Sequence, residues 1–111
     1  MEPKFEIEFL ERAREFLVGI NPIAREKMIY NIDKSRLLND PRLFKKVQDE
    51  IWEFRAEYNG IQHRLLAFWD KRNKRNTLVV CTHGIIKKTN KVPGNEINVA
   101  LAIMKLYFEQ Y

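Results

Sequence analysis

The chain has 111 residues, enough for one domain and not two, and its 45% hydrophobic and 12% aromatic content argues against disorder. Its single cysteine excludes an internal disulfide and a cysteine-based zinc site. Residues 1–60 carry 11 Lys+Arg against 12 Asp+Glu, whereas residues 61–111 carry 9 against 3, so the net charge of +5 comes from the second half. Such a one-sided charge attracts a polyanion, and we expect nucleic acid.

Three further absences favour a reduced, cytoplasmic compartment and argue against a membrane. No apolar run approaches the roughly 20 residues of a membrane span. The N-terminus alternates charges and lacks the apolar core of a signal peptide. No amphipathic helix is rich in lysine on its polar face, so we rank nucleic acid ahead of a membrane surface.

The first part of the chain predicts one strand and two helices. Residues 5–9 alternate between apolar and charged side chains, which is typical of a half-buried strand. Residues 10–20 change to helical spacing. Asn21 is a good N-cap and Pro22 suits the first position of a second helix, which we expect to end at about Ser35. Together the helices predict an αα-hairpin with a short turn.

Three strands are expected next, after an irregular stretch over residues 40–48 that opens on a turn signal. The first strand covers 51–58 and is followed by Asn59-Gly60, a hairpin signal. The second covers 63–69. The third covers 77–83 and is apolar on both faces, which predicts a central strand.

A last helix is expected to begin at Pro93 and Asn95. Its predicted buried stripe consists of Ile97, Ala100, Leu101, Met104 and Phe108. The order of elements is then β-α-α-β-β-β-α. This order predicts a single α+β domain over residues 1–111, in which the helices pack on one antiparallel sheet.

Several segments of this layout carry a specific pattern, namely Ile51-Trp52-Glu53-Phe54-Arg55, residues 63–68, residues 83–93, and Glu96-Ile97 with Ala100. In this pattern the chain resembles the phage-derived, HigB-type branch of the RelE/ParE toxin superfamily. The most specific motif is Gly-x-x-Lys-Lys-Thr-x-Lys-x-Pro. The resemblance covers nearly the whole chain and implies a RelE-like fold. It also implies a type II toxin that is silenced by a helix-turn-helix, HigA-like antitoxin. Active members of the family cut messenger RNA on the ribosome, without metal or cofactor.

The residues are compatible with this chemistry. RNA is cut when its 2′-hydroxyl attacks the neighbouring phosphate, and the protein must orient the ribose and neutralise the charge on phosphorus. Arg64 is our first candidate for the phosphate, since the arginine fork binds it bidentately and since it matches the middle-strand arginine that active family members use. Arg55, on the adjacent strand, is the second. The alternative for Arg64 is a structural salt bridge to Glu53 or Glu57.

The leaving oxygen must also be protonated, and His83 is the first candidate for proton transfer. We expect His83 to end the central strand, beside a basic loop. A histidine that only caps the strand by hydrogen bonding is an equal alternative. His63 is a second candidate, but it precedes Arg64 on a strand, so these two side chains point to opposite faces and only one can face the RNA. Two histidines without Asp or Cys at ligand spacing predict that there is no metal site.

The remaining candidate RNA-binding cations lie in two loops, Lys87, Lys88 and Lys91 after the third strand and Lys71 and Arg72 before it. Each is expected to bind the phosphate backbone or to steer it, and Lys87 is also a candidate for stabilising the transition state. Glu53 departs from the family, because related active branches often carry Lys or Arg there. Its carboxylate either serves as a base or repels phosphate.

Two other functions stay open. One is a ParE-like toxin that poisons DNA gyrase without cleaving nucleic acid. The other is a degenerate relative that binds only RNA or its antitoxin. The motif at 83–93, together with Arg64 and His83, favours the endoribonuclease, because a gyrase poison needs no set of residues that cleaves a phosphodiester.

Overall fold

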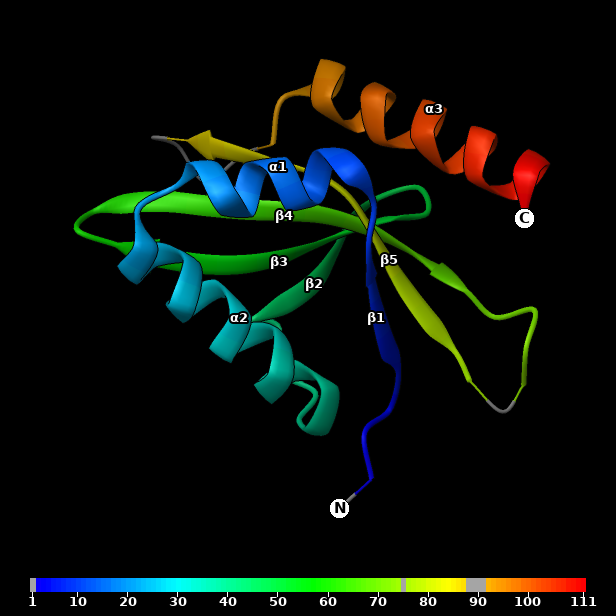
Figure 1. Ribbon diagram of the computed structural model, residues 1–111, viewed down its shortest axis with the longest axis horizontal. Helices are drawn as coiled ribbons and strands as arrows, with labels where there is room; N and C mark the ends of the chain where they lie inside the picture. Colours follow the sequence, from blue (N-terminus) through cyan, green and yellow to red (C-terminus); the bar gives the residue numbers. More distant parts are fainter. Residues whose placement is uncertain (1, 75, 88–91) are drawn as a thin grey trace.

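The computed structural model describes residues 2–74, 76–87 and 92–111 (Figure 1). Their elements are β1 (Glu6–Phe9), α1 (Glu11–Gly19), α2 (Pro22–Leu37), β2 (Phe44–Gln48), β3 (Ile51–Tyr58), β4 (Ile61–Asp70), β5 (Leu78–Lys87) and α3 (Gly94–Gln110). The strands form one sheet of order β1-β5-β4-β3-β2. The predicted α+β class is confirmed. None of the described helices is long and apolar enough to cross a membrane.

Two details of the predicted sheet were wrong. Residues 40–48 are not irregular throughout, since β2 lies there and pairs antiparallel with β3. Phe44 is the one buried residue of β2, and its ring stacks on Phe54 with centroids 4.1 Å apart. One aromatic anchor in a mostly polar segment gives almost no period-two signal. The sheet is also not wholly antiparallel, because β1 runs parallel to β5.

The two N-terminal helices begin where the sequence predicts. The side-chain oxygen of Asn21 accepts a hydrogen bond from the backbone N–H of Ile23 at 2.8 Å, which confirms the N-cap. The helices pack chiefly on the sheet, α1 over β5 and α2 over β3, rather than on one another. A Cβ on Gly84 of β5 would lie 2.1 Å from the ring of Phe16 in α1, so this close approach requires glycine.

Each face of the sheet has its own core. The α1 and α2 face buries Phe5, Ala13, Leu17, Met28, Ile32, Phe54, Leu65 and Cys81, among others. The α3 face buries Ile51, Leu66, Phe68, Val80, Ile97, Ala100 and Tyr107. The predicted stripe of α3 was wrong at its end, because Phe108 is 38% exposed and Tyr107 is buried instead. The hydroxyl of Tyr107 donates a hydrogen bond to Asp70 at 2.8 Å, which draws this face of the helix inward.

The β3–β4 hairpin turns on two residues with positive φ, Asn59 at 54° and Gly60 at 75°. This is the turn that the Asn-Gly pair predicts. It places Tyr58 opposite Ile61 and thereby sets the pairing of every residue along the two strands. Toward this hairpin, the face that carries α3 changes from apolar to polar, and the candidate site lies there.

Candidate active site

Three neighbouring rows of side chains on the α3 face form the candidate site. Residues that pair across antiparallel strands turn their side chains to the same face. The middle row is Arg55, Arg64 and Ile85. The row on one side is Lys45, Glu53, Leu66 and His83, and the row on the other side is Glu57, Gln62 and Lys87. Rows on one face are two residues apart along a strand, or about 7 Å.

Glu53 is the acid at the centre of these cations and is 1% exposed. Its Oε2 lies 3.3 Å from Nε of Arg55 and 3.5 Å from Nε of Arg64. Both contacts are ion pairs without a hydrogen bond, because both Nε atoms and Glu53 Oε1 have no hydrogen-bond partner among the described residues. Buried polar atoms without partners cost folding free energy. Three of them in one cluster indicate a site shaped for a ligand rather than for stability.

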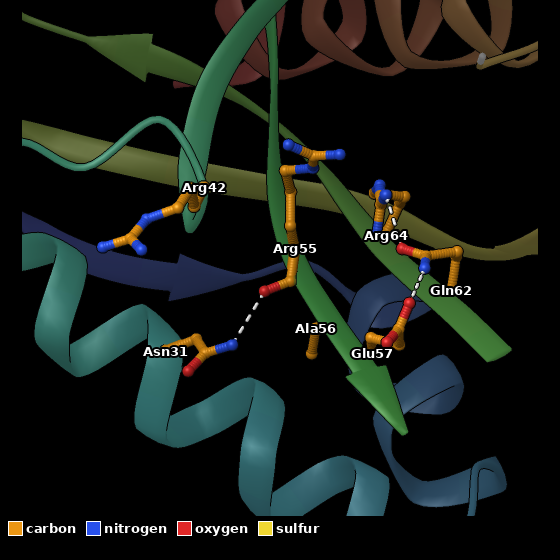
Figure 2. Close-up of a pocket in the computed structure, with 7 residues that line it drawn as sticks. All are labelled: Asn31, Arg42, Arg55, Ala56, Glu57, Gln62 and Arg64. Atoms are coloured by element: carbon orange, nitrogen blue, oxygen red, sulfur yellow. Dashed lines mark hydrogen bonds between the residues drawn. The ribbon is translucent and has the colours of Figure 1, made fainter. Parts of the chain in front are cut away.

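Arg64 is held by its neighbours on β4. Its Nη1 donates to the carbonyl of His63 at 3.1 Å and its Nη2 to Oε1 of Gln62 at 2.7 Å, while Gln62 donates to Glu57. Figure 2 shows this chain of side chains beside Arg55. Burial lowers the pKa of the Arg64 guanidinium, and the charge of Glu53 opposes that shift. The salt bridge to Glu53 that the sequence offered as an alternative is therefore present.

A polar cavity of about 300 Å³ opens beside these arginines, at the edge of β3 (Figure 2). It is lined by Asn31, Arg42, Arg55, Ala56, Glu57, Gln62 and Arg64. Nδ2 of Asn31 donates to the carbonyl of Arg55 at 2.9 Å, and Lys27 donates to the carbonyl of Glu57. Helix α2 thus satisfies the outward carbonyls of β3 where β2 no longer pairs with it.

Lys87 lies opposite Gln62, on the far side of the arginine row, and is 6% exposed. Burial lowers the pKa of its ammonium, Glu53 raises it, and the charges of Arg64, Arg55 and Lys45 lower it further. A lowered pKa makes the ammonium a readier proton donor. The structure therefore brings this predicted residue together with both arginines.

His83 lies on the same face as Arg64, but it does not end the strand as predicted. The β5 strand continues to Lys87, because residues 83–87 pair with β4. A register shift between Leu66 and Ala67 leaves Thr82 as an extra residue before His83. His83 is 4% exposed, with Nδ1 3.0 Å from Thr82 Oγ1 and Nε2 3.3 Å from Glu96 Oε2. Burial lowers the pKa of the imidazole and Glu96 opposes this, so we infer a neutral ring near pH 7.

His63 points to the opposite face, as the alternation predicts, since it pairs with Ala56 of the α1 and α2 core. Of the other predicted cations, Lys71 and Arg72 are not brought to the site. Lys88 and Lys91 lie outside the described residues. Lys71 and Arg72 follow the end of β4 that is remote from Arg64, and Arg72 is bonded to Asp70 there.

Three residues of the site, Lys45, Gln62 and Glu96, were not predicted from the sequence, and neither was the central position of Glu53. A signal for two of these was present. Glu53 and Arg55 are two residues apart, as are Gln62 and Arg64, so each pair shares a face. The two-residue turn then fixes Arg55 opposite Arg64. Lys45 and Glu96 needed β2 and α3 to be placed. Among the described residues, no three His, Cys, Asp or Glu side chains are grouped as metal ligands.

Comparisons with known proteins agree with this fold. The family described as "Phage derived protein Gp49-like (DUF891)" matches residues 15–105. No curated protein sequence matches the chain. A chain of the toxin–antitoxin complex RelBE2 from Mycobacterium tuberculosis is 23% identical, with a TM-score of 0.56, over 80% of this chain and 97% of that one.

A mutant of the E. coli toxin RelE in the free state is 14% identical, with a TM-score of 0.62, over 89% of this chain and 96% of that one. Identities this low show a shared fold alone. The match to the family model shows membership of that family, because it covers most of the chain and includes all three rows of the site. The chain therefore belongs to the phage-derived Gp49-like family and has the RelE fold.

Proposed function

We propose that this chain is the toxin of a type II toxin–antitoxin pair and that it cuts messenger RNA on the ribosome. The observation that supports this most is the order of the three rows. Two arginines in the middle are flanked along the strands by Glu53 and His83 on one side and by Lys87 on the other. The two solved structures compared above are or contain RelE-type toxins, and one is a complex with an antitoxin.

The rows fit an in-line displacement at phosphorus. A phosphate gripped by Arg55 and Arg64 lies between a proton acceptor and a proton donor. Glu53 takes the proton of the 2′-hydroxyl, whose oxygen bonds to phosphorus. The bond from phosphorus to the 5′-oxygen breaks, and Lys87 protonates that oxygen. The products are a 2′,3′-cyclic phosphate and a 5′-hydroxyl end. The three cations supply the positive charge on which the transition state depends.

The remaining residues of the site have supporting roles in this proposal. His83, in the same row as Glu53 and neutral, is the alternative base. The partner is a helix-turn-helix, HigA-like antitoxin, as the resemblance to the HigB-type branch implies. An acidic segment of such a protein is complementary to the basic second half of the chain.

The test is to add the purified chain to a translating lysate and to map the 5′-ends of a defined message. We expect new 5′-hydroxyl ends only when ribosomes are translating. A matched message with a single 2′-deoxynucleotide at the cut position should stay intact there, because the attacking hydroxyl is missing. Intact messages together with breaks in DNA would instead support a gyrase poison. Intact messages with RNA binding retained would support the degenerate relative.

Glu53→Gln separates the two roles of this carboxylate. The amide has nearly the same size but no charge, so an anionic ligand no longer meets a buried negative charge. We expect the affinity for an all-2′-deoxy version of the target strand to rise roughly tenfold. We expect cleavage of the ribose form to fall about a hundredfold or more, as for loss of a general base.

Fluorescence anisotropy and single-turnover cleavage measure these two effects, and Glu109→Gln on exposed α3 surface is the matched control. Urea unfolding verifies that Glu53→Gln is folded, because the variant removes one partner of the buried pair with Arg64. Cleavage at the wild-type rate, with tighter binding, would show that Glu53 only neutralises the arginines. The base would then be His83.

A further inference from the structure

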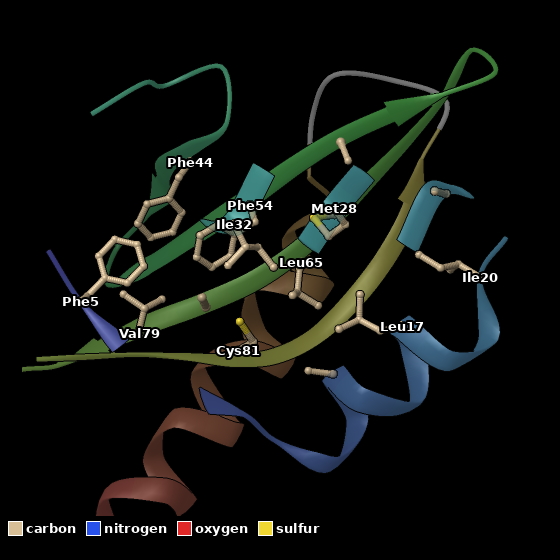
Figure 3. Close-up of a cluster of buried hydrophobic side chains, with 14 residues drawn as sticks. Phe5, Leu17, Ile20, Met28, Ile32, Phe44, Phe54, Leu65, Val79 and Cys81 are labelled. Atoms are coloured by element: carbon tan, nitrogen blue, oxygen red, sulfur yellow. The ribbon is translucent and has the colours of Figure 1, made fainter. Parts of the chain in front are cut away.

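A second cavity lies on the opposite face of the sheet, the face that carries α1 and α2. Its volume is about 220 Å³, and it lies between the start of β1, the end of α2 and the strands β2 to β4. Its apolar walls are the rings of Phe5, Phe44, Trp52 and Trp69, and we call it the aromatic pocket. Figure 3 shows Phe5 and Phe44 side by side at one end of the core. A concave, mostly apolar space with a few polar groups at its border is the usual form of a binding site.

The four rings do not lie in one plane, so they border a hollow and do not form a flat surface. Trp52 and Trp69 meet at 74° with centroids 5.6 Å apart, and Phe5 and Trp69 also meet at 74°, at 5.1 Å. A nucleic-acid base stacks on a flat ring face. Lys71 Nζ already lies over the ring of Trp69, 5.0 Å from its centre. The shape therefore favours a single inserted side chain over a stacked base.

The rim of the aromatic pocket is positive. Lys4 lines it, Lys71 covers Trp69, and Lys46 pairs with Trp52 across the β2–β3 ladder and so shares its face. One acid, Asp40, also lines it. Arg42 donates to Asp40 through Nε at 3.1 Å and Nη2 at 2.9 Å, which holds the pKa of that carboxyl low and neutralises its charge. Three lysines remain to attract an acidic partner.

We infer that the aromatic pocket is a docking site for an acidic peptide segment that inserts one large apolar side chain. Apolar anchors in a pit with complementary charges at the rim are typical of protein interfaces. The aromatic pocket and the three rows of the candidate site lie on opposite faces of the sheet. A partner bound in the pocket therefore leaves Arg55 and Arg64 accessible. The inference goes beyond the proposed function, because it does not depend on RNA cleavage.

The chain itself contains the probe for a test. It has two tryptophans, and both line the aromatic pocket. We would titrate the full chain with a Glu-rich decapeptide that carries one central Phe and follow tryptophan emission. We expect a saturable change with a Kd below about 1 mM. The same peptide with Ala for Phe should bind at least about tenfold more weakly, because the anchor is lost.

The charges are tested with the double variant Lys46→Glu/Lys71→Glu, which should lower the affinity at least about tenfold. Its control is Lys105→Glu, at an exposed position of α3, which should bind as the wild type does. Exposed lysines tolerate this change, and circular dichroism verifies the fold. No saturable change up to about 1 mM peptide, or equal binding of the Ala peptide, would overturn the inference. A response to an oligoribonucleotide but not to peptide would also overturn it and would assign the pocket to RNA.

Discussion

Arg64→Lys is expected to slow RNA cleavage by about 10²–10³-fold while the protein stays folded, because a preorganised donor to the reacting phosphate is lost. Lysine keeps the positive charge beside Glu53 but has no planar fork. The native guanidinium is fixed by Gln62 and by the carbonyl of His63, with one edge turned to Glu53. An ammonium cannot make these contacts and also grip two phosphate oxygens.

The choice of lysine over alanine matters. Arg64 is 1% exposed and Glu53 is equally buried, so alanine would leave a buried carboxylate with one ion-pair partner fewer. Breaking a buried pair in this way typically costs about 3–5 kcal/mol. Loss of cleavage in Arg64→Ala would then report unfolding as readily as chemistry. Arg64→Lys avoids this problem, and urea unfolding verifies it.

Two matched variants complete the experiment, which measures single-turnover cleavage of a ribosome-bound message. Arg55→Lys should slow cleavage less, by about tenfold. The Arg55 side chain is 24% exposed and makes only the ion pair to Glu53 among the described residues. Arg72→Lys, at the remote end of β4, should cleave at the wild-type rate. A wild-type rate for Arg64→Lys would show that Arg64 is only the structural partner of Glu53.

The sequence predicts most of this fold because its signals are local. Asn21 and Pro22 fix the start of α2, and Asn59-Gly60 fixes the hairpin through backbone conformations that few other residues adopt. The missed parts depend on contacts between distant residues. Phe44 of β2 stacks on Phe54 of β3, and β1 pairs in parallel with β5, where Glu6 lies opposite Leu78.

In the candidate site, too, some residues could be predicted from the sequence and others depend on contacts between distant residues. Arg55, Arg64 and Lys87 were predicted by residue type, and the sheet places all three on one face. Lys71 and Arg72 were predicted from charge density, and they lie apart from these three. The side chain of Lys71 lies over the ring of Trp69, and that of Arg72 forms an ion pair with Asp70. Glu53 was identified only as a departure, since a sequence does not show that one acid is surrounded by four cations.

Asp70→Asn is expected to lower the free energy of unfolding by about 2–3 kcal/mol at pH 7. Asp70 is 6% exposed and joins the end of β4 to the end of α3. It accepts hydrogen bonds from Arg72 Nε and Nη2 at 2.9 and 2.8 Å and from the Tyr107 hydroxyl at 2.8 Å. Arg72 also donates to the carbonyl of Tyr111 at 2.6 Å. The neutral amide weakens both contacts to the carboxylate.

The dependence on pH identifies this contribution. The hydrogen bonds from Arg72, and then that from Tyr107, hold the pKa of Asp70 well below its usual 3.8. A carboxyl with a lowered folded pKa stabilises the fold above its unfolded pKa, so the contribution is complete above about pH 4 and declines as the pH falls. Burial, and then the hydrogen bond to Asp70, raise the pKa of Tyr107 from 10.0 to about 12. Its contribution is therefore complete below about pH 10 and is lost by about pH 12.

Urea unfolding across this range, compared with wild type, is the measurement. Asp70→Asn should show a smaller acidic decline than the wild type, and Tyr107→Phe a smaller alkaline one. If the difference in free energy of unfolding between wild type and Asp70→Asn is the same at about pH 3 and pH 7, the charge of the carboxylate does not stabilise the packing of α3.

The Asp70→Asn variant also tests whether the two ends of α3 are independent. Glu96 contacts His83 at the start of the helix, whereas Asp70 holds its end, and the apolar contacts of Ile97 and Ala100 lie near the start. A weaker contact at the C-terminal end of α3 should therefore leave the three rows of the candidate site in place. We expect Asp70→Asn to cleave RNA at the wild-type rate wherever it is fully folded. A large loss of activity without unfolding would mean that the position of Glu96 depends on the whole helix, and that α3 couples the two ends of the sheet.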